Sequence, residues 1–325
     1  NIKVGPNKNS TGELLVIGRF KKSDTKSLVS FLSNVDKDRV LEAISIDLSE
    51  GESGDYLLIS GSSSYKRIMI YNLGDKDKIT NDIIRAFGSK LYSLVNSKKL
   101  KSMILDTKSF GMSNNDKIQS MIEGLVLGSY TFEDYKSKKG KKNYLASISL
   151  MGKVDGSIIK KAKIIGESVC FARDLGNHPA NILTPTYLAN ESKRISKAKN
   201  MKCTITDVSK FEKMGLGSFY GVARGAKEPA KMIIVEYNGG SKKQKPIALV
   251  GKGVTFDTGG ISLKPPARMD EMKFDMCGSA TVMGVMNAVS ILQPKINIVF
   301  AIGATENMPG SDAQRPGAIV KAYNG

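Results

Sequence analysis

The chain has 325 residues, 41% hydrophobic and 25% charged, which exceeds what one hydrophobic core usually supports and predicts two domains. Three cysteines without CxxC spacing argue against a disulfide framework, and no apolar run reaches the roughly 18 residues that a membrane span needs. The net charge of +18 lies almost entirely before residue 251, because residues 251–325 contain seven Lys or Arg against six Asp or Glu. We interpret this excess as a solvated, lysine-rich surface, with a nucleic-acid-binding face as the alternative.

Short apolar runs alternate with helical patterns along the whole chain. Such alternation predicts α/β domains with mostly parallel or mixed sheets. In residues 1–150 the expected strands are 14–20, 56–60, 67–72, 102–106 and 144–150, the expected helices are 79–98 and 116–127, and 136–142 is a loop or linker. In residues 151–325 the expected helices are 157–175, 185–199 capped by Thr184, a short one stopping at Gly215, and 279–292, and the expected strands are 203–208, 231–237, 246–250 and 296–303.

Charged residues collect in residues 250–280, where a strand is expected to end. The apolar run 247–250 leads into a glycine-dense loop that carries Lys252, Asp257 and Lys264, and Asp275 follows just before a helix start. Loops at strand ends are typical places for sites in α/β folds. The spelling excludes a P-loop and a dinucleotide fingerprint, because Gly253 stands where the first needs Ser or Thr and Phe256 where the second needs glycine.

Two interpretations of these residues stay open from their chemistry alone. Asp257 and Asp275 are hard carboxylate ligands suited to Mg²⁺, Mn²⁺ or Zn²⁺, and a neutral Lys252 amine could join them. Lys252 and Asp257 would face opposite sides of a regular strand, and Gly253 is expected to bend the backbone and bring them together. Alternatively, Lys252 and Lys264 simply form ion pairs with the two aspartates.

The segment GKGVTFDTGGISLKP at 251–265, followed by MDEMKFDMCGSA at 269–280, resembles the signature of the leucyl aminopeptidase family, the cytosol aminopeptidases. Further matching segments are EGLVLGSYTFEDYKSKK at 123–139, RDLGNHPANILTP at 173–185, GVARGAKEP at 221–229, ENMPG at 306–310 and RPGAIVKAYNG at 315–325. The resemblance implies a metallo-exopeptidase that releases N-terminal, preferably leucine-like, residues from peptides. The implied fold is α/β, with an N-terminal macro-like α/β domain (residues 1–150) and an α/β/α catalytic domain with a central mixed sheet (residues 151–325, C-terminally incomplete).

The resemblance also assigns roles to particular residues. Lys252, Asp257 and Asp275 would be metal ligands, with Asp257 bridging two divalent ions, Mn²⁺ or Zn²⁺. Lys264 would be the catalytic lysine that donates to the scissile carbonyl oxygen of the bound substrate, and Met272 would line the pocket for the N-terminal side chain. Two ions can polarise a carbonyl, activate a water and hold a free amino group. The implied full-length protein is a cytoplasmic homohexamer away from membranes, in which bicarbonate could serve as general base.

One family signature, NTDAEGRL, is expected after Gly325 and is not among these residues. In the family it supplies two further carboxylate ligands and the arginine that holds bicarbonate, so we expect a fragment that is inactive alone. Glu306 receives no ligand role from the resemblance, His178 is interpreted as structural, and Cys277 lacks a histidine partner for nucleophilic work. A nucleic-acid-binding role of the basic N-terminal portion and a catalytically inactive relative stay open as alternatives.

Overall fold

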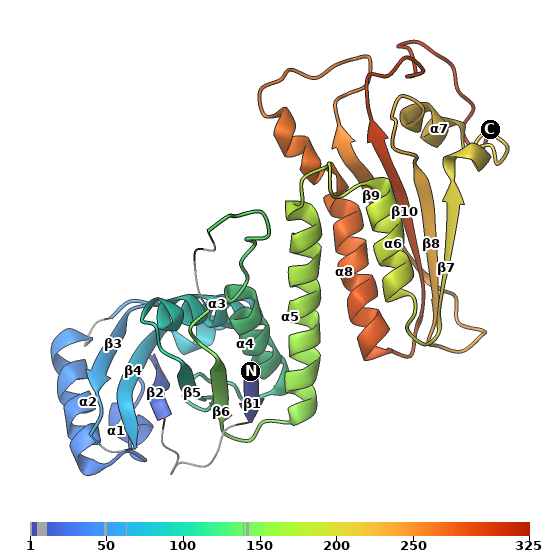
Figure 1. Cartoon of the computed structure of the whole chain (residues 1–325). Helices are drawn as coiled ribbons and strands as arrows, with labels where there is room; N and C mark the ends of the chain where they lie inside the picture. Colours follow the sequence, from blue (N-terminus) through green and yellow to red (C-terminus); the bar gives the residue numbers. More distant parts are fainter. Residues whose placement is uncertain (1, 5–11, 49–50, 63, 139, 141–142) are drawn as a thin grey trace. The chain divides into compact units, whose positions relative to one another are not determined.

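The computed structural model describes residues 2–4, 12–48, 51–62, 64–138, 140 and 143–325. The chain divides into two compact units, Asn1–Glu167 and Ser168–Gly325, whereas the sequence suggested a domain boundary after residue 150 (Figure 1). Helix α5 (Gly156–Asn177) begins in the first unit and ends in the second. Both units are α/β with a mixed sheet, as predicted.

The first unit is a six-stranded sheet with helices on both faces. The strand order is β1-β6-β5-β2-β4-β3, and every neighbouring pair is parallel except β3 with β4. Its elements before α5 are β1 (Ile2–Val4), β2 (Gly12–Phe20), α1 (Thr25–Leu28), α2 (Asn34–Asp47), β3 (Tyr56–Ser60), β4 (Tyr65–Gly74), η1 (Lys76–Lys78), α3 (Asn81–Ser97), β5 (Ser102–Asp106), α4 (Asn115–Gly128) and β6 (Ser147–Met151).

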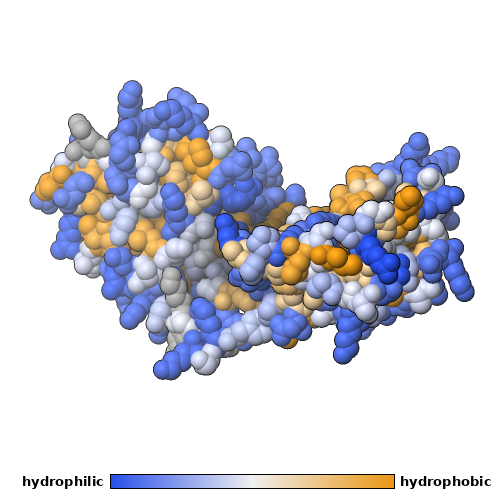
Figure 2. All heavy atoms as spheres, turned by 90° about the horizontal axis from the view of Figure 1, so that it is seen from above, coloured by the Kyte–Doolittle hydropathy of each residue, from blue (hydrophilic) through white to orange (hydrophobic). Residues whose placement is uncertain are grey.

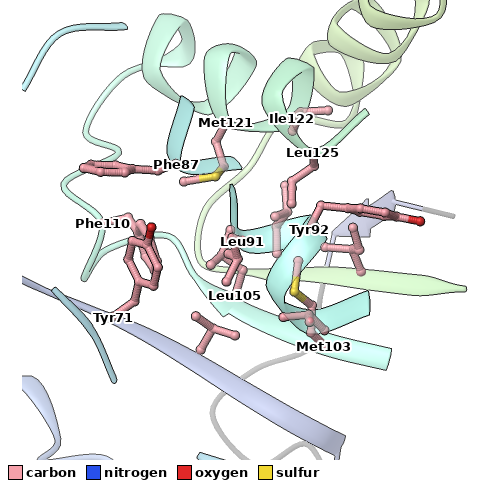
Figure 3. Close-up of a cluster of buried hydrophobic side chains, with 14 of the residues drawn as sticks. Tyr71, Phe87, Leu91, Tyr92, Met103, Leu105, Phe110, Met121, Ile122 and Leu125 are labelled. Atoms are coloured by element: carbon pink, nitrogen blue, oxygen red, sulfur yellow. The ribbon is translucent and has the colours of Figure 1, made fainter. Parts of the chain in front are cut away.

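Strand β2 shows why this sheet is covered on both sides. Its side chains alternate between faces, so Leu14 and Val16 join the cluster under α3 and α4, while Leu15 and Ile17 join the cluster under α1 and α2. Figure 3 shows the first cluster, where Phe87 and Leu91 of α3 point toward the side chains of the sheet. An apolar run buried on both faces is typical of a parallel strand.

The second unit contains a four-stranded sheet in the order β7-β8-β10-β9, in which only β9 and β10 pair in parallel among the described strands. Its elements after α5 are α6 (Pro185–Ile195), β7 (Met201–Asp207), η2 (Val208–Lys210), α7 (Gly217–Ala223), β8 (Lys231–Asn238), β9 (Ile247–Asp257), η3 (Met269–Met276), α8 (Cys277–Leu292) and β10 (Asn297–Asn307). Ile233 and Val235 of β8 pack in one cluster with residues of α6 and α8, and Met232 packs in a second cluster with residues of α7.

Most predicted elements are confirmed, but several expectations differ from the structure. Strand β9 continues to Asp257 instead of ending at Val250, so the predicted glycine-dense loop begins later. The helix expected to stop at Gly215 is a short 3-10 turn, η2, followed by turns, and α6 ends at Ile195. The structure adds α2 and α7, which the sequence did not suggest. The expected linker 136–142 lies partly outside the described residues.

One stretch of the second unit, Met269–Leu292, is apolar and long enough to span a membrane by length and composition, although no such run was expected. A helix in a protein core passes the same test, and α8 is one, because Met283 and Met286 are fully buried. Hydrophilic side chains cover most of the face seen in Figure 2, with separate apolar patches.

Candidate active site

Strand β9 carries the first two candidate residues at the edge of the described sheet. Its register with β10 places Lys252 opposite Gly303 and Asp257 opposite Asn307. Positions 303 and 307 are four apart in β10, so both pairs lie on the same face of the sheet. Lys252 and Asp257 therefore share a face although five residues separate them.

A β-bulge, and not the expected bend at Gly253, produces this arrangement. Val254 pairs with Thr305 and Phe256 with Glu306, so β9 has one extra residue, Thr255, between two consecutive partners. An extra residue reverses the alternation of all side chains that follow it. The buried Thr255 hydroxyl donates to the carbonyl of Thr305 at 3.3 Å, which stabilises the bulge.

Asp257 forms the centre of a hydrogen-bonded group. Lys264 Nζ lies 2.6 Å from Asp257 Oδ2 and 3.2 Å from its carbonyl oxygen. Asp257 Oδ1 accepts from the Gly259 N–H at 2.9 Å and from Asn307 Nδ2 at 2.7 Å. Burial acts to raise the pKa of Asp257, but these hydrogen bonds outweigh it and hold the pKa below its usual value. The carboxylate is therefore ionised at neutral pH.

Asp275 and Lys252 form the second charged pair. Asp275 is the penultimate residue of η3, which directly precedes α8, and its Oδ1 lies 2.7 Å from Lys252 Nζ. Gly278 allows the start of α8 to lie close to β9, since a Cβ at this position would be 3.0 Å from the Lys252 backbone nitrogen. The ion pairing that the sequence left open is thus present for both lysines.

The residues also fit a bound cation. Asp275 Oδ2 is buried and has no hydrogen-bond partner among the described residues, which is costly for a carboxylate oxygen unless a cation satisfies it. Within the described part of the chain, no three His, Cys, Asp or Glu side chains gather, so the donor set would be two carboxylates with a lysine amine. Carboxylate oxygens and a neutral amine are suitable ligands for Mn²⁺ or Zn²⁺.

Other residues singled out from the sequence lie as follows. Met272 of η3 has its Sδ 3.1 Å from Lys264 Nζ, so it adjoins the Asp257 group. The His178 ring packs against Tyr187, with ring centroids 5.8 Å apart. Burial, with Asp275 nearby, raises the pKa of the Cys277 thiol, which keeps it protonated at neutral pH. Burial, with Glu228 nearby, likewise raises the pKa of Glu306.

Asn307 is the site residue that sequence reasoning missed. It belongs to the segment ENMPG, which was used only for the resemblance. Its amide donates to Asp257, and its carbonyl accepts from the Thr258 N–H and hydroxyl at 2.9 and 2.7 Å. No pattern of residue types marks this role, because the contact depends on the pairing of β9 with β10.

The structure is a two-domain α/β chain whose second unit holds the lysine–carboxylate pairs of Asp257 and Asp275, and comparison with known proteins names the family. The model of the cytosol aminopeptidase family catalytic domain matches residues 170–325, and the model of the family's N-terminal domain matches residues 16–139. The chain belongs to the cytosol aminopeptidase family.

Individual relatives agree with this assignment. A probable cytosol aminopeptidase of Pseudomonas syringae pv. tomato is 38% identical over 85% of this chain and 58% of its own length. One from Aromatoleum aromaticum is 36% identical over the whole chain and 67% of its own length. The chain thus spans about three fifths to two thirds of these relatives.

Solved structures show the same fold. A mutant of tomato leucine aminopeptidase has a TM-score of 0.83 and 27% identity, covering the whole of this chain and 66% of its own. The bottromycin maturation enzyme BotP in complex with Mn has a TM-score of 0.77 and 24% identity, covering 97% of this chain and 64% of its own. The two-domain α/β architecture expected from the sequence is confirmed.

Proposed function

We propose that the protein is a metal-dependent aminopeptidase that releases N-terminal, preferably leucine-like, residues from peptides by a two-metal hydrolytic mechanism. The family and the names of the relatives support peptidase activity. The observation that supports the metal dependence most directly is the buried Asp275 Oδ2 without a partner, in a segment that resembles the family signature. These names do not favour the nucleic-acid alternative.

In this proposal Lys252, Asp257 and Asp275 would hold two divalent ions, and Asp257 would be the ligand that serves both. The chemistry that such ions supply when bound is polarisation of the scissile carbonyl and activation of a water. The side chains of Lys252 and Asp275 lie 2.7 Å apart, so both are close enough to contact one ion. Mn²⁺ or Zn²⁺ suits this donor set, and BotP was solved with Mn.

Lys264 is the proposed catalytic residue toward the substrate. Its Nζ is held by the Asp257 carboxylate and by Met272 Sδ, so the ammonium has a fixed position beside the proposed bridging ligand. A positioned ammonium stabilises negative charge that develops on a carbonyl oxygen. Met272, which touches the same Nζ, would contact the N-terminal side chain of the substrate. In both roles, the side chains of Lys264 and Met272 would contact the substrate.

The full-length protein is proposed to act on peptides as a cytoplasmic homohexamer, with bicarbonate as a possible general base. The present 325 residues lack the NTDAEGRL signature, so we expect no activity from them alone. Metal binding is the test that this chain permits. Titration of the chain with Mn²⁺ should show saturable binding that Asp257→Ala abolishes, while retained binding would refute the bridging role.

Activity is tested in a full-length family protein that contains these residues. Release of leucine from Leu-p-nitroanilide should depend on added metal and disappear in Asp257→Ala. Lys264→Met should lower kcat and leave metal binding in place, because Lys264 is not a proposed ligand. Metal-independent hydrolysis by the wild-type protein would overturn the proposed function.

A further inference from the structure

A cavity of about 260 Å³ lies in the second unit beside the Asp257 group. Its walls come from residues 259–262 after β9, from Gly221 and Val222 of α7, from Asn307 and from residues 313–317. The Asn307 amide donates to Asp257 Oδ1 at 2.7 Å. One side chain therefore touches both the cavity and a proposed metal ligand.

Glycines leave the room that forms this cavity. Gly259 and Gly260 have φ values of +90° and +70°, which side-chain-bearing residues rarely adopt. A Cβ on Gly260 would lie 2.9 Å from Asn307 Oδ1, and a Cβ on Gly221 would overlap the side chain of Gln314. Larger residues at these positions would fill the space or displace its walls.

One residue that lines the cavity carries a positive charge. Among the described residues that line it, Arg315 is the one with an ionisable side chain. Within the described part of the chain, its guanidinium forms no ion pair with a carboxylate, in contrast to the nearby Arg224, which pairs with Asp312 at 2.6 Å. A guanidinium offers two parallel N–H donors that match the two oxygens of a carboxylate.

We propose that this cavity binds the carboxylate of an amino-acid-sized ligand through Arg315. The choice of ligand rests on the proposed function, because an aminopeptidase meets two such carboxylates, that of the released amino acid and that of a short peptide's last residue. A volume of about 260 Å³ is below the roughly 300–1,000 Å³ of sites for drug-sized ligands, so the cavity suits one residue. The carboxamide of Asn307 offers a hydrogen-bonding partner for the ligand's N–H.

Binding of N-acetyl-L-leucine to the 325-residue chain in the presence of a chelator tests the proposal. The acetyl group blocks the free amine that a metal site would hold, so the measurement does not depend on peptidase activity. Titration calorimetry or ligand-observed NMR should show binding of N-acetyl-L-leucine and at least about tenfold weaker binding of N-acetyl-L-leucinamide, which lacks the carboxylate. Arg315→Gln should weaken binding of the acid by about tenfold or more.

The matched control is Arg39→Gln, which removes an exposed arginine on α2 of the first unit and should bind the acid like the wild-type chain. Equal binding of acid and amide, unchanged binding by Arg315→Gln, or no binding to the wild-type chain would each overturn the proposal. If N-acetyl-glycyl-L-leucine binds more tightly than N-acetyl-L-leucine, the natural ligand is the C-terminal residue of a short peptide. Equal binding of the two compounds indicates that it is the released amino acid. Failure of the aminopeptidase proposal would appear separately, as absent Mn²⁺ binding.

Discussion

The substitution Asp275→Asn distinguishes the contribution of this carboxylate to the free energy of unfolding from its contribution to cation binding. Its Oδ1 pairs with Lys252, whose side chain is 60% exposed, and such pairs contribute on the order of 0–1 kcal/mol. Its Oδ2 is buried without a hydrogen-bond partner, which destabilises the fold by about 1–3 kcal/mol, and Asn leaves a similar group there. We therefore expect the free energy of unfolding of the metal-free chain to change by no more than about 1 kcal/mol.

With metal present the two chains should differ strongly. A ligand that binds only the folded state at 100 times its Kd stabilises it by about 2.7 kcal/mol. For a domain of this size each kcal/mol raises Tm by roughly 2–4 °C, so Mn²⁺ should raise the wild-type Tm by about 5–11 °C. Asp275→Asn lacks one of the proposed ligand charges, so its Tm should hardly respond to Mn²⁺ at the same concentration.

The assay is thermal unfolding followed by circular dichroism, with EDTA and with excess Mn²⁺. Asp270→Asn is the matched control, because it removes an exposed carboxylate of the same 3-10 segment and should keep the full metal response. An undiminished Mn²⁺ response in Asp275→Asn would refute the assignment of Asp275 as a ligand. Loss of the response in Asp270→Asn would show that it reflects general charge and not a site.

Three further predictions concern the first unit, each measured by urea unfolding. Gly124→Ala should destabilise it by about 1–3 kcal/mol, since a Cβ there would overlap the backbone carbonyl of Arg85, whereas Gly156→Ala, with open space around it, should not. Glu123→Gln should cost about 1–3 kcal/mol, because the buried carboxylate accepts from Arg85 at 2.8 Å. Burial raises the pKa of Asp106 in the folded protein. The protonated side chain therefore contributes stability below the pKa of the unfolded chain, and this contribution is lost as pH rises through the pKa of the folded protein. Asp106→Asn should remove this loss of stability with rising pH, and a variant with the same pH profile as the wild-type chain would contradict the prediction.

Local signals predicted much of the fold because they act over a few residues. The Thr184 hydroxyl accepts from the Tyr187 N–H at 3.2 Å with Pro185 at the first helical position, as the sequence suggested for α6. By contrast, α7 contains Gly217 and Gly221, which are poor helix formers, and it is held by packing of residues such as Phe219. Tertiary contacts that have no local pattern were therefore the main source of missed elements.

The candidate site shows the same division between local and distant information. The motif pointed to Lys252, Asp257 and Asp275, and the structure pairs Asp275 with Lys252. The way in which β9 brings Lys252 and Asp257 to one face was predicted wrongly, because a bulge is defined by the partner strand. Asn307 was missed for the same reason, since 50 residues separate it from Asp257 in the chain.

The bulge at Thr255 links the face that Lys252 and Asp257 share to the number of residues between them. If Thr255 were deleted and the register with β10 became regular, Lys252 and Asp257 would be four positions apart and would still share a face, opposite Gly303 and Asn307. A regular register without any deletion would instead place the two residues on opposite faces, because they are five apart in the chain. We therefore expect the site to tolerate loss of the bulge only together with the loss of one residue from this segment.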